Sequence, residues 1–282
     1  MARVTVINTG FFKLDGGAMF GVVPKSMWSK LNPPDDNNMC TWAMRCLLVE
    51  EGDRKILIDT GIGNKQSEKF RSHFSPTNII DFKSDLDYYG FDASEITDVI
   101  LTHFHFDHAG GVLSLDNKGQ IVPTFPNAKV WSNDYHLDWA LHPNERERAS
   151  FLTENIQPLL DFNILNLVEL GENVKFSETI TLDFVYGHTG AMMLPTIQLA
   201  TGKKIIFCAD LLPSSFHVGL PYIMAYDVQP LVTLKEKEEL FDKACDGKTY
   251  LFTEHDPFTN YISVERSDSG KVVIKERTDI LD

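Results

Sequence analysis

The chain has 282 residues, which is enough to bury a substantial core in one large or two small domains. Its composition, with 43% hydrophobic and 11% aromatic residues, is typical of a globular protein and excludes a disordered or fibrous one. The 40 acidic and 26 basic residues give a formal charge of -14, which argues against a nucleic-acid partner because phosphate binding needs clustered lysine and arginine.

The sequence also predicts a cytoplasmic protein without a membrane partner. The opening MARVTVINTG lacks the long apolar core of a signal peptide, and the chain has no run of about 18 apolar residues. The four cysteines show no CxxC pair and lie in or beside apolar runs, so we expect buried free thiols. These cysteines are Cys40, Cys46, Cys208 and Cys245.

The first third of the chain predicts strands around an unusual segment. A strand is expected at ARVTVIN, residues 2–8. Residues 10–39 combine glycine and proline with more large apolar side chains than a solvated loop needs. Packing, a subunit contact and a pocket wall explain that load equally well. Residues 41–63 predict two β-runs joined by a turn at 51–53, followed by an exit loop that begins at Asp59.

The middle of the chain alternates helix and strand. Residues 82–101 predict a short helix that stops at Gly90, then a capped turn and a strand that ends at Leu101. A short strand is expected at 127–131, and an amphipathic helical insert at about 132–160.

The last part predicts mainly strands. A helix is expected at 235–245, then a strand at 249–253 and two closing β-runs. Earlier β-runs are expected at 165–170, 173–177, 180–186, 195–200 and 203–209. Strands interleaved with helices, without a repeat or a linker, predict α/β layers in a single domain over residues 1–282.

The motif LTHFHFDHAGG, residues 101–111, places three histidines and an aspartate within six positions of a strand-end loop. An HxH pair on a loop projects two imidazoles the same way, and the Asp-His pair adds two donors. Neutral imidazole and carboxylate are the usual nitrogen and oxygen ligands of zinc. The motif therefore predicts a metal site rather than a polar loop with incidental histidines. Its donors are His103, His105, Asp107 and His108.

Three more donors come directly after predicted strands, at His188, Asp210 and His255. Each alone would be an ordinary strand-end residue, but three of them together with the motif indicate a common site. Seven donors are too many for one tetrahedral ion, and they suit two metals that share a bridging carboxylate.

These elements carry a family resemblance. THFHFDHAGG, GHTG, the Ala-Asp of FCAD and TEHD resemble, in order and spacing, the metallo-β-lactamase superfamily, and LIDTG resembles its first motif. The resemblance covers about residues 42–256. It implies an α/β fold, a four-layer αββα sandwich, with the metals at one edge of its two sheets.

The resemblance also implies a role for each donor and two zinc ions as cofactors, with manganese or iron as alternatives. Asp59 of the first motif is expected to support the site without binding metal. Asp210 is expected to bridge the ions. The first metal is expected on His103, His105 and His188, and the second on Asp107, His108 and His255.

Within the superfamily, two branches fit poorly: Asp210 stands where zinc β-lactamases have cysteine, and His105 where the flavodiiron branch has a carboxylate. Members that process nucleic acids need a basic exosite, which the acidic composition of this chain does not suggest. Glyoxalase II-like enzymes carry C-terminal basic residues, which the C-terminal KVVIKERTDILD matches poorly. The nearest resemblance is to the N-acyl-homoserine lactone lactonases and related organophosphate and aryl-ester hydrolases. HFDHAGG and, less specifically, residues 209–230 carry it.

The expected function is therefore a dinuclear-zinc hydrolase, in which a metal-bridging hydroxide opens an ester ring. A quorum-quenching lactonase acting on an N-acyl-homoserine lactone is the first expectation. Organophosphate or aryl-ester hydrolysis at the same site is the alternative, and a mononuclear iron oxygenase of the persulfide dioxygenase type is a further one. The expected partner is a small ester or lactone, and the chain is a candidate homodimer.

The proton donor is the open question of this site. Many lactonases of the group have a tyrosine three residues after the bridging aspartate, where this chain has Pro213, which lacks both a hydroxyl and an N–H. His217 is the preferred replacement, because imidazole titrates near neutral pH, and Tyr222 is the next candidate. Packing is the more ordinary explanation for Tyr222 and Tyr226. The expected catalytic residues are Asp107, Asp210, His217 and Tyr222.

Overall fold

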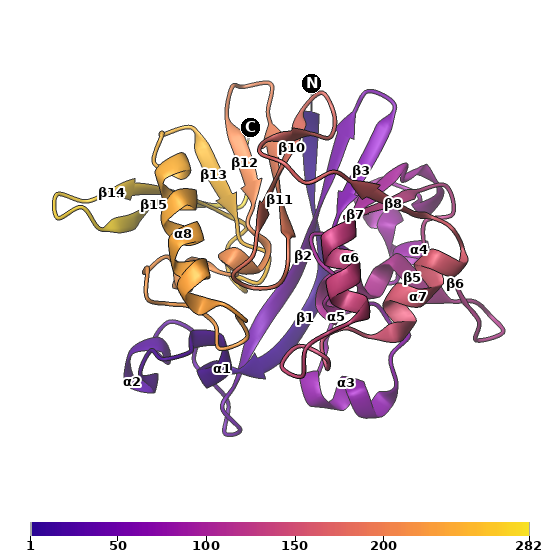
Figure 1. Ribbon diagram of the computed structural model, residues 1–282, viewed down its shortest axis with the longest axis horizontal. Coiled ribbons are helices and arrows are strands. Elements are labelled where there is room, and N and C mark those ends of the chain that lie inside the picture. The colour runs from indigo at the N-terminus through magenta and orange to yellow at the C-terminus, as the bar shows by residue number, and fades with distance from the viewer. Residues whose placement is uncertain (1, 282) are drawn as a thin grey trace. The chain divides into compact units, whose positions relative to one another are not determined.

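The structure is a computed structural model that describes residues 2–281, and it divides into two compact units. Unit 1 contains the residues up to Phe12 and Met44–Leu170. Unit 2 contains Lys13–Ala43 and the residues from Gly171 onward. Each unit is built on one mixed sheet, and most of the strands are labelled in Figure 1. The single domain expected over the whole chain stays a prediction.

The sheet of unit 1 has the strand order β1-β2-β3-β4-β7-β8. β2 and β3 are antiparallel, whereas β3, β4, β7 and β8 run parallel. The loops after β3 and β4, which contain Asp59 and the HxHxDH motif, therefore leave the same edge of the sheet. The strands are β1 (Ala2–Asp15), β2 (Met39–Glu51), β3 (Arg54–Ile58), β4 (Asp98–Ile100), β7 (Lys129–Asn133) and β8 (Leu165–Val168).

Short helices and a hairpin complete unit 1. One buried cluster joins strand residues such as Leu57 and Val99 to Leu86, Phe104 and Leu159 from the helices and loops. The predicted helical insert contains α6 and α7. The helices are α3 (Glu68–Phe74), α4 (Phe82–Asp85), η1 (Leu86–Tyr89), η2 (Ala93–Glu95), α5 (Phe106–Ala109), η3 (Gly110–Val112), α6 (Asp134–Leu141) and α7 (Thr153–Asp161), and the hairpin is β5 (Leu113–Leu115) with β6 (Ile121–Pro123).

The sheet of unit 2 has the order β15-β14-β13-β12-β11-β10-β9. β12 and β13 are parallel and every other neighbouring pair is antiparallel, so β10, β12 and β13 all run the same way. His188, Asp210 and His255 each follow one of these three strands. The strands are β9 (Val174–Lys175), β10 (Ile180–Val185), β11 (Met192–Gln198), β12 (Lys204–Phe207), β13 (Thr249–Phe252), β14 (Tyr261–Arg266) and β15 (Val272–Thr278).

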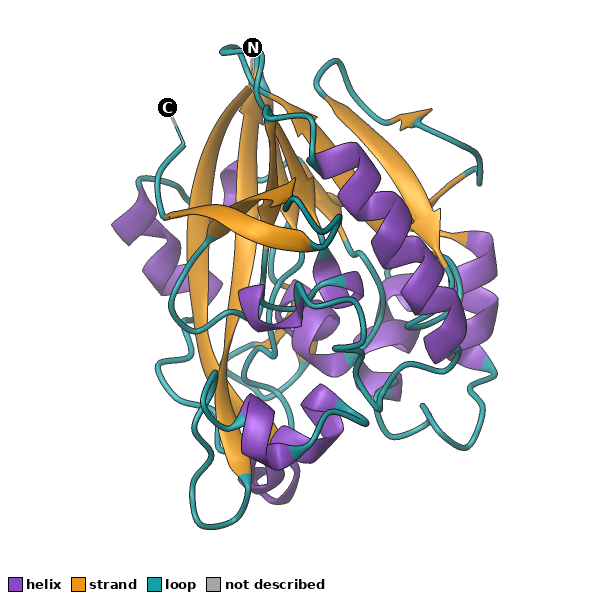
Figure 2. Ribbon diagram, turned by 90° about the vertical axis from the view of Figure 1, so that its left-hand side faces the viewer, coloured by secondary structure: helices purple, strands orange, loops and turns teal. Residues whose placement is uncertain are grey.

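One long helix and several short ones accompany this sheet. The long helix α8 (Pro230–Ala244) packs against β13 and β14, and Figure 2 distinguishes helix from strand by colour. No helix within residues 2–281 is long and apolar enough to cross a membrane. All four cysteines are free, and only Cys245 is not fully buried. The short helices are α1 (Gly16–Phe20), α2 (Lys25–Trp28), η4 (Ala209–Leu211) and η5 (Ser215–His217).

Three elements have a boundary that differs from the prediction by three residues or more. β1 continues past residue 8, because Gly10 adopts a φ of +126° inside the strand and Phe11 pairs with Thr77. β11 begins at Met192, ahead of the predicted start at Pro195. α8 begins at Pro230 rather than at 235, since the fixed φ of proline suits the first turn of a helix.

Candidate metal centre

The HxHxDH motif of unit 1 gathers four buried donors at the end of β4. The ring centroid of His103 lies 4.5 Å from that of His105 and 4.0 Å from that of His108. Asp107 Oδ2 lies 3.9 Å from His108 Nε2. All four residues are at most 7% exposed, so their charges are poorly screened by water.

The two glycines that follow the motif let it lie directly against the loop after β3. A Cβ atom on Gly110 would meet the carbonyl oxygen of Ile62 at 2.0 Å, and one on Gly111 would meet that of Thr60 at 2.2 Å. Thr60 donates from its backbone N and its Oγ1 to the carbonyl of His108, at 2.7 and 2.8 Å. Larger residues at the two glycine positions would push the loops apart.

Asp59 orients two of the motif's histidines. Its carboxylate accepts hydrogen bonds from Thr102 N and Thr102 Oγ1, both at 2.7 Å, and from His108 Nδ1 at 3.0 Å. Because the single hydroxyl proton of Thr102 goes to Asp59, the 3.0 Å contact of His103 Nδ1 with Thr102 Oγ1 must be donated by the histidine. Both histidines therefore keep Nε2 for a metal, and the supporting role of Asp59 stays a prediction.

Asp59 holds this position at a conformational cost. Its φ is +59°, in the left-handed region that non-glycine residues rarely adopt. Such backbone strain persists only where surrounding interactions over-determine it, and it concentrates at functional sites. In this protein, the three hydrogen bonds to the Asp59 carboxylate hold the residue in this strained conformation.

In unit 2, Asp210 lies between two histidines. Its Oδ2 is 3.0 Å from His188 Nε2, and its Oδ1 is 3.1 Å from His255 Nε2. Asp210 follows Ala209, another non-glycine residue with a positive φ, of +43°. A carboxylate that turns one oxygen toward each of two imidazoles has the form required of a ligand shared by two ions.

The outer nitrogens of these two histidines are also engaged. His188 Nδ1 contacts Asp227 Oδ1 at 2.8 Å, and His255 Nδ1 donates to the carbonyl of Ala43 at 2.7 Å. A carbonyl only accepts, so in neutral His255 the Nε2 lone pair faces a carboxylate oxygen of Asp210. That arrangement is unfavourable unless a positive charge is bound there, and a metal ion is one that these residues could hold.

The electrostatics around His188 indicate the same need for a cation. Burial lowers the pKa of His188, but the charges and hydrogen bonds of Asp210 and Asp227 outweigh burial and raise the pKa to about 10. Surroundings that hold a proton so firmly also favour a metal cation on the same nitrogen. Asp227 was not singled out in the sequence, because nothing local marks an aspartate that is 39 residues away from its histidine.

The residues present fit metal binding. Histidines that bind metals almost always donate their other ring N–H to a carboxylate, a carbonyl or water. His108, His188 and His255 show that pattern, and His103 has the hydroxyl of Thr102 in the same place. The described residues include buried histidine and aspartate groups of the kind that hold metal ions, and the seven predicted ligands are among their members. The role of each ligand stays a prediction.

The surroundings of His217 do not suit a proton donor. His217 is fully buried, its Nε2 lies 2.9 Å from the carbonyl of Met19, and its Nδ1 lies 2.7 Å from Ser214 Oγ. Its ring stacks on Phe20 at a centroid distance of 4.9 Å and an angle of 3°. Burial lowers the pKa of His217 to about 3, so the ring is neutral at pH 7 and both nitrogens are engaged. The flanks of His217 in SSFHVG are typical of a loop, but the structure buries the ring away from solvent.

Tyr222 belongs to the same aromatic cluster but is only half-buried. Phe20 meets the edge of Tyr222 at 6.2 Å and stacks on Trp28 at 5.3 Å. Packing therefore accounts for Phe20 and Trp28 within the apolar segment 10–39. Val22, which is 92% exposed, and Met27, which is 52% exposed, are not explained by packing within the chain.

A buried lysine holds the loop that carries His217 and Tyr222. Lys237 of α8 is 1% exposed, and its Nζ donates to four backbone carbonyls of that loop. The acceptors are His217 at 2.7 Å, Tyr222 at 2.8 Å, Gly219 at 3.1 Å and Leu220 at 3.3 Å. Burial lowers the pKa of Lys237 to about 7, whereas the four carbonyls favour its charged form.

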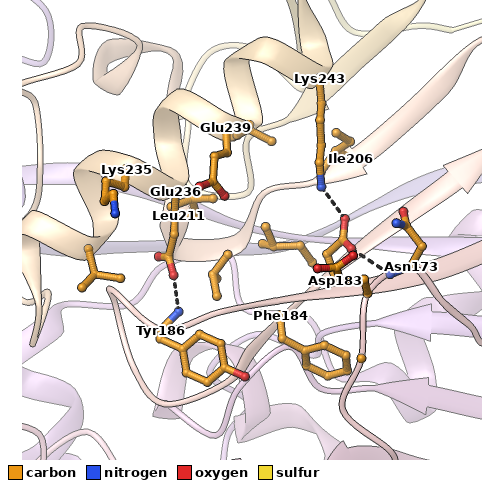
Figure 3. A pocket seen from close by; sticks show the side chains of 16 residues that line it. Asn173, Asp183, Phe184, Tyr186, Ile206, Leu211, Lys235, Glu236, Glu239 and Lys243 are labelled. Carbon is orange, nitrogen blue, oxygen red and sulfur yellow. Dashed lines mark hydrogen bonds and ion pairs between the residues drawn. The ribbon is translucent and has the colours of Figure 1, made fainter.

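A separate pocket of about 590 Å³ lies in unit 2 between α8 and β10 (Figure 3). Lys243 Nζ pairs with Asp183 there at 2.8 Å, and Glu236 accepts hydrogen bonds from the backbone of Tyr186 and Gly187. None of its lining residues is a predicted ligand. The pocket contributes to the candidate metal centre only indirectly, because its lining residue Glu236 accepts hydrogen bonds from the turn that leads to His188.

Comparison with known proteins identifies the family to which these motifs belong. A family model described as the metallo-beta-lactamase superfamily matches residues 45–255. This match confirms the predicted family and the α/β fold class, in which mixed sheets and helices are consistent with the αββα sandwich. The predicted enzyme class is confirmed as well, since metal-dependent hydrolases are among the structural neighbours.

Two solved structures illustrate the similarity. A probable metal-dependent hydrolase from Staphylococcus aureus is 28% identical, with a TM-score of 0.87 over 100% of this chain and 98% of that chain. AidC, described as a dizinc quorum-quenching lactonase in complex with a product, is 20% identical, with a TM-score of 0.77 over 100% of this chain and 96% of its own. The second likeness shows the fold alone.

The chain also matches part of a curated ribonuclease. A ribonuclease of Thermus thermophilus is 26% identical over 167 residues, which are 58% of this chain and 34% of the ribonuclease. The chain thus spans about a third of that relative's length. The similarity covers part of the shared fold and leaves the remaining two thirds of the ribonuclease without a counterpart in the match.

Proposed function

Because this chain belongs to the metallo-β-lactamase superfamily, we propose that it is a two-metal hydrolase of small esters, acting first on N-acyl-homoserine lactones. The observation that carries the two-metal part is Asp210, with one oxygen toward His188 and the other toward His255. The likeness to the fold of AidC supports the lactone part. The charge of -14 disfavours the polyanionic substrate of a ribonuclease.

The protein's own residues would divide the work between holding metals and orienting ligands. When bound, two metal ions would supply an activated water as nucleophile and a Lewis acid for the ester carbonyl. His103, His105 and His188 would hold one ion, and Asp107, His108 and His255 the other, with Asp210 shared. Asp59 and Asp227 would keep the imidazoles in the ligating tautomer.

The leaving alkoxide of a lactone needs a proton, and we assign its delivery to Tyr222. His217 has both nitrogens engaged, and Pro213 has no hydroxyl. Tyr222 is half-buried, and Lys237 fixes the backbone at its position through the Tyr222 carbonyl. Zinc as the metal, the cytoplasmic location, the absence of nucleic-acid and membrane partners, and the homodimer remain predictions.

The experiment is a substrate panel run on protein whose metal content has been measured. The zinc-loaded chain is expected to contain close to two equivalents of zinc and to hydrolyse acyl-homoserine lactones faster than paraoxon-like triesters, aryl esters and thioesters. A preference for triesters or aryl esters would overturn the proposed lactone substrate but not the proposed two-metal site. One tightly held iron, with activity on persulfides, would overturn the two-metal hydrolase itself.

A further inference from the structure

The helical insert of unit 1 contributes a residue to the candidate metal centre. We propose that Glu147 positions His105, by holding the proton on Nε2 so that Nδ1 is the nitrogen offered to the metal. This inference rests on the proposed two-metal function. It gives the insert a part in metal binding that none of the seven ligand positions reveals.

Glu147 is built into the protein rather than merely near the site. It lies between α6 and α7 and is 2% exposed. Its Oε2 accepts hydrogen bonds from Trp139 Nε1 at 2.8 Å and from Asn144 Nδ2 at 2.5 Å. Its Oε1 lies 3.6 Å from His105 Nε2, which is the range of an ion-pair contact rather than a hydrogen bond.

The surroundings make this contact electrostatically strong. His105 is 6% exposed, and the ring of Phe151, which also belongs to the insert, lies 4.7 Å from the imidazole. A carboxylate at this distance in an apolar, water-poor setting acts on the ring with far less screening than at the surface. It therefore favours the tautomer in which Nε2 carries the proton and Nδ1 carries the lone pair.

This choice sets His105 apart from the other predicted histidine ligands. His103, His108, His188 and His255 have Nδ1 engaged by protein groups and keep Nε2 for the metal. His105 shows the reverse, because its Nε2 is the nitrogen that faces a carboxylate. Within the motif, His105 would therefore offer a different nitrogen from His103 and His108.

The variant Glu147→Gln tests the proposal without removing volume. Two donors, Trp139 Nε1 and Asn144 Nδ2, point at Oε2, so the amide oxygen must stay on that side. The amide NH₂ is then forced toward His105 Nε2, where a donor meets a donor. The substitution removes the charge and reverses the polarity at one atom, which opposes the ligating tautomer.

The readouts are zinc affinity, by competition with a chromogenic chelator, and the nitrogen chemical shifts of His105 in full-length, ¹⁵N-histidine-labelled protein. Glu147→Gln is expected to weaken zinc binding about 10- to 100-fold. In the wild type, the metal-induced shift of His105 is expected on Nδ1. Glu145→Gln is the matched control, because Glu145 is exposed and pairs with Arg148, and it is expected to bind zinc like the wild type.

Trp139→Phe is a second variant that keeps Glu147 and removes one of its two anchors. It is expected to weaken zinc binding in the same direction and by a smaller factor. Unchanged affinity in Glu147→Gln, or a metal-bound Nε2 of His105 in the wild type, would overturn the positioning role. Failure of the wild type to bind two zinc ions would instead overturn the proposed function, so the two failures are distinguishable.

Discussion

Two of the buried histidines of unit 2, at the end of β10 and in η5, have opposite surroundings. His188 lies between the carboxylates of Asp210 and Asp227, which raise its pKa to about 10 against the effect of burial. His217 lies between a hydroxyl and a carbonyl and against an aromatic ring, and burial lowers its pKa to about 3. Burial is the same in both, so the charge of the partners decides whether a histidine attracts a cation or becomes part of the core.

The strongest test of this comparison removes the carboxylate that faces two histidines. Asp210→Ala is expected to lose at least one of two metal equivalents and nearly all hydrolysis, because His188 and His255 lose their shared partner. Metal content by elemental analysis and turnover of a lactone measure it. A folded variant that keeps two metals and full turnover would sink the two-metal interpretation.

A smaller effect is expected at the outer nitrogen of His188. Asp227→Asn keeps the shape but removes the charge at 2.8 Å, so metal affinity should fall about 10- to 100-fold. Chelator competition measures it. Asp242→Asn is the control, because Asp242 is an exposed partner of Arg266, and equal losses in both variants would assign the effect to net charge rather than to His188.

The His217 region should respond in stability rather than in chemistry. The folded-state pKa of about 3 lies below the ordinary 6.5, so the unfolded chain binds the proton more readily. The stability from His217 is complete above pH 6.5 and is lost as the pH falls toward 3, by about 1.4 kcal/mol per pH unit. His217→Gln should therefore show a shallower decrease in unfolding free energy between about pH 6.5 and pH 4, followed by urea titration.

The same variant tests the catalytic alternative for His217. Its lactone turnover should stay within about tenfold of the wild type, whereas loss of a general acid would cost about 10²- to 10⁴-fold. A loss in the larger range, with two metals still bound, would restore His217 as the acid. Lactone turnover of Tyr222→Phe, compared with that of Tyr226→Phe, tests whether Tyr222 is the proton donor.

The smallest effect is expected from Ser214→Ala. The Ser214 hydroxyl is 2.7 Å from His217 Nδ1, and its loss leaves a buried nitrogen without that partner, at a cost of about 1–3 kcal/mol in unfolding free energy. Metal affinity should not change, because no charge is altered. A drop in metal affinity equal to that of Asp227→Asn would mean that the two histidine regions do not differ as described.

The sequence predicted what is contiguous along the chain. The family model confirms the family and the α/β class, and the roles of the seven ligands stay predictions. The HxHxDH motif, the strand-end donors and the α/β class depend on short patterns with specific chemistry. The sequence did not predict the contacts of Glu147 with His105 and of Asp227 with His188, because each contact joins residues that are far apart along the chain. His217 was predicted near the chemistry because imidazole titrates near neutral pH, whereas the Met19 carbonyl that its Nε2 contacts is 198 residues away.

The lysine that holds the Tyr222 loop has a consequence for divergence. One ammonium group gathers the carbonyls of His217, Gly219, Leu220 and Tyr222, so the backbone of the loop is held from α8. Side chains of the loop that take no part in the proposed proton delivery can then be exchanged on that backbone. With the proposed role of Tyr222, we expect the loop to be a position where substrate preference can be engineered in single steps while Lys237 is kept.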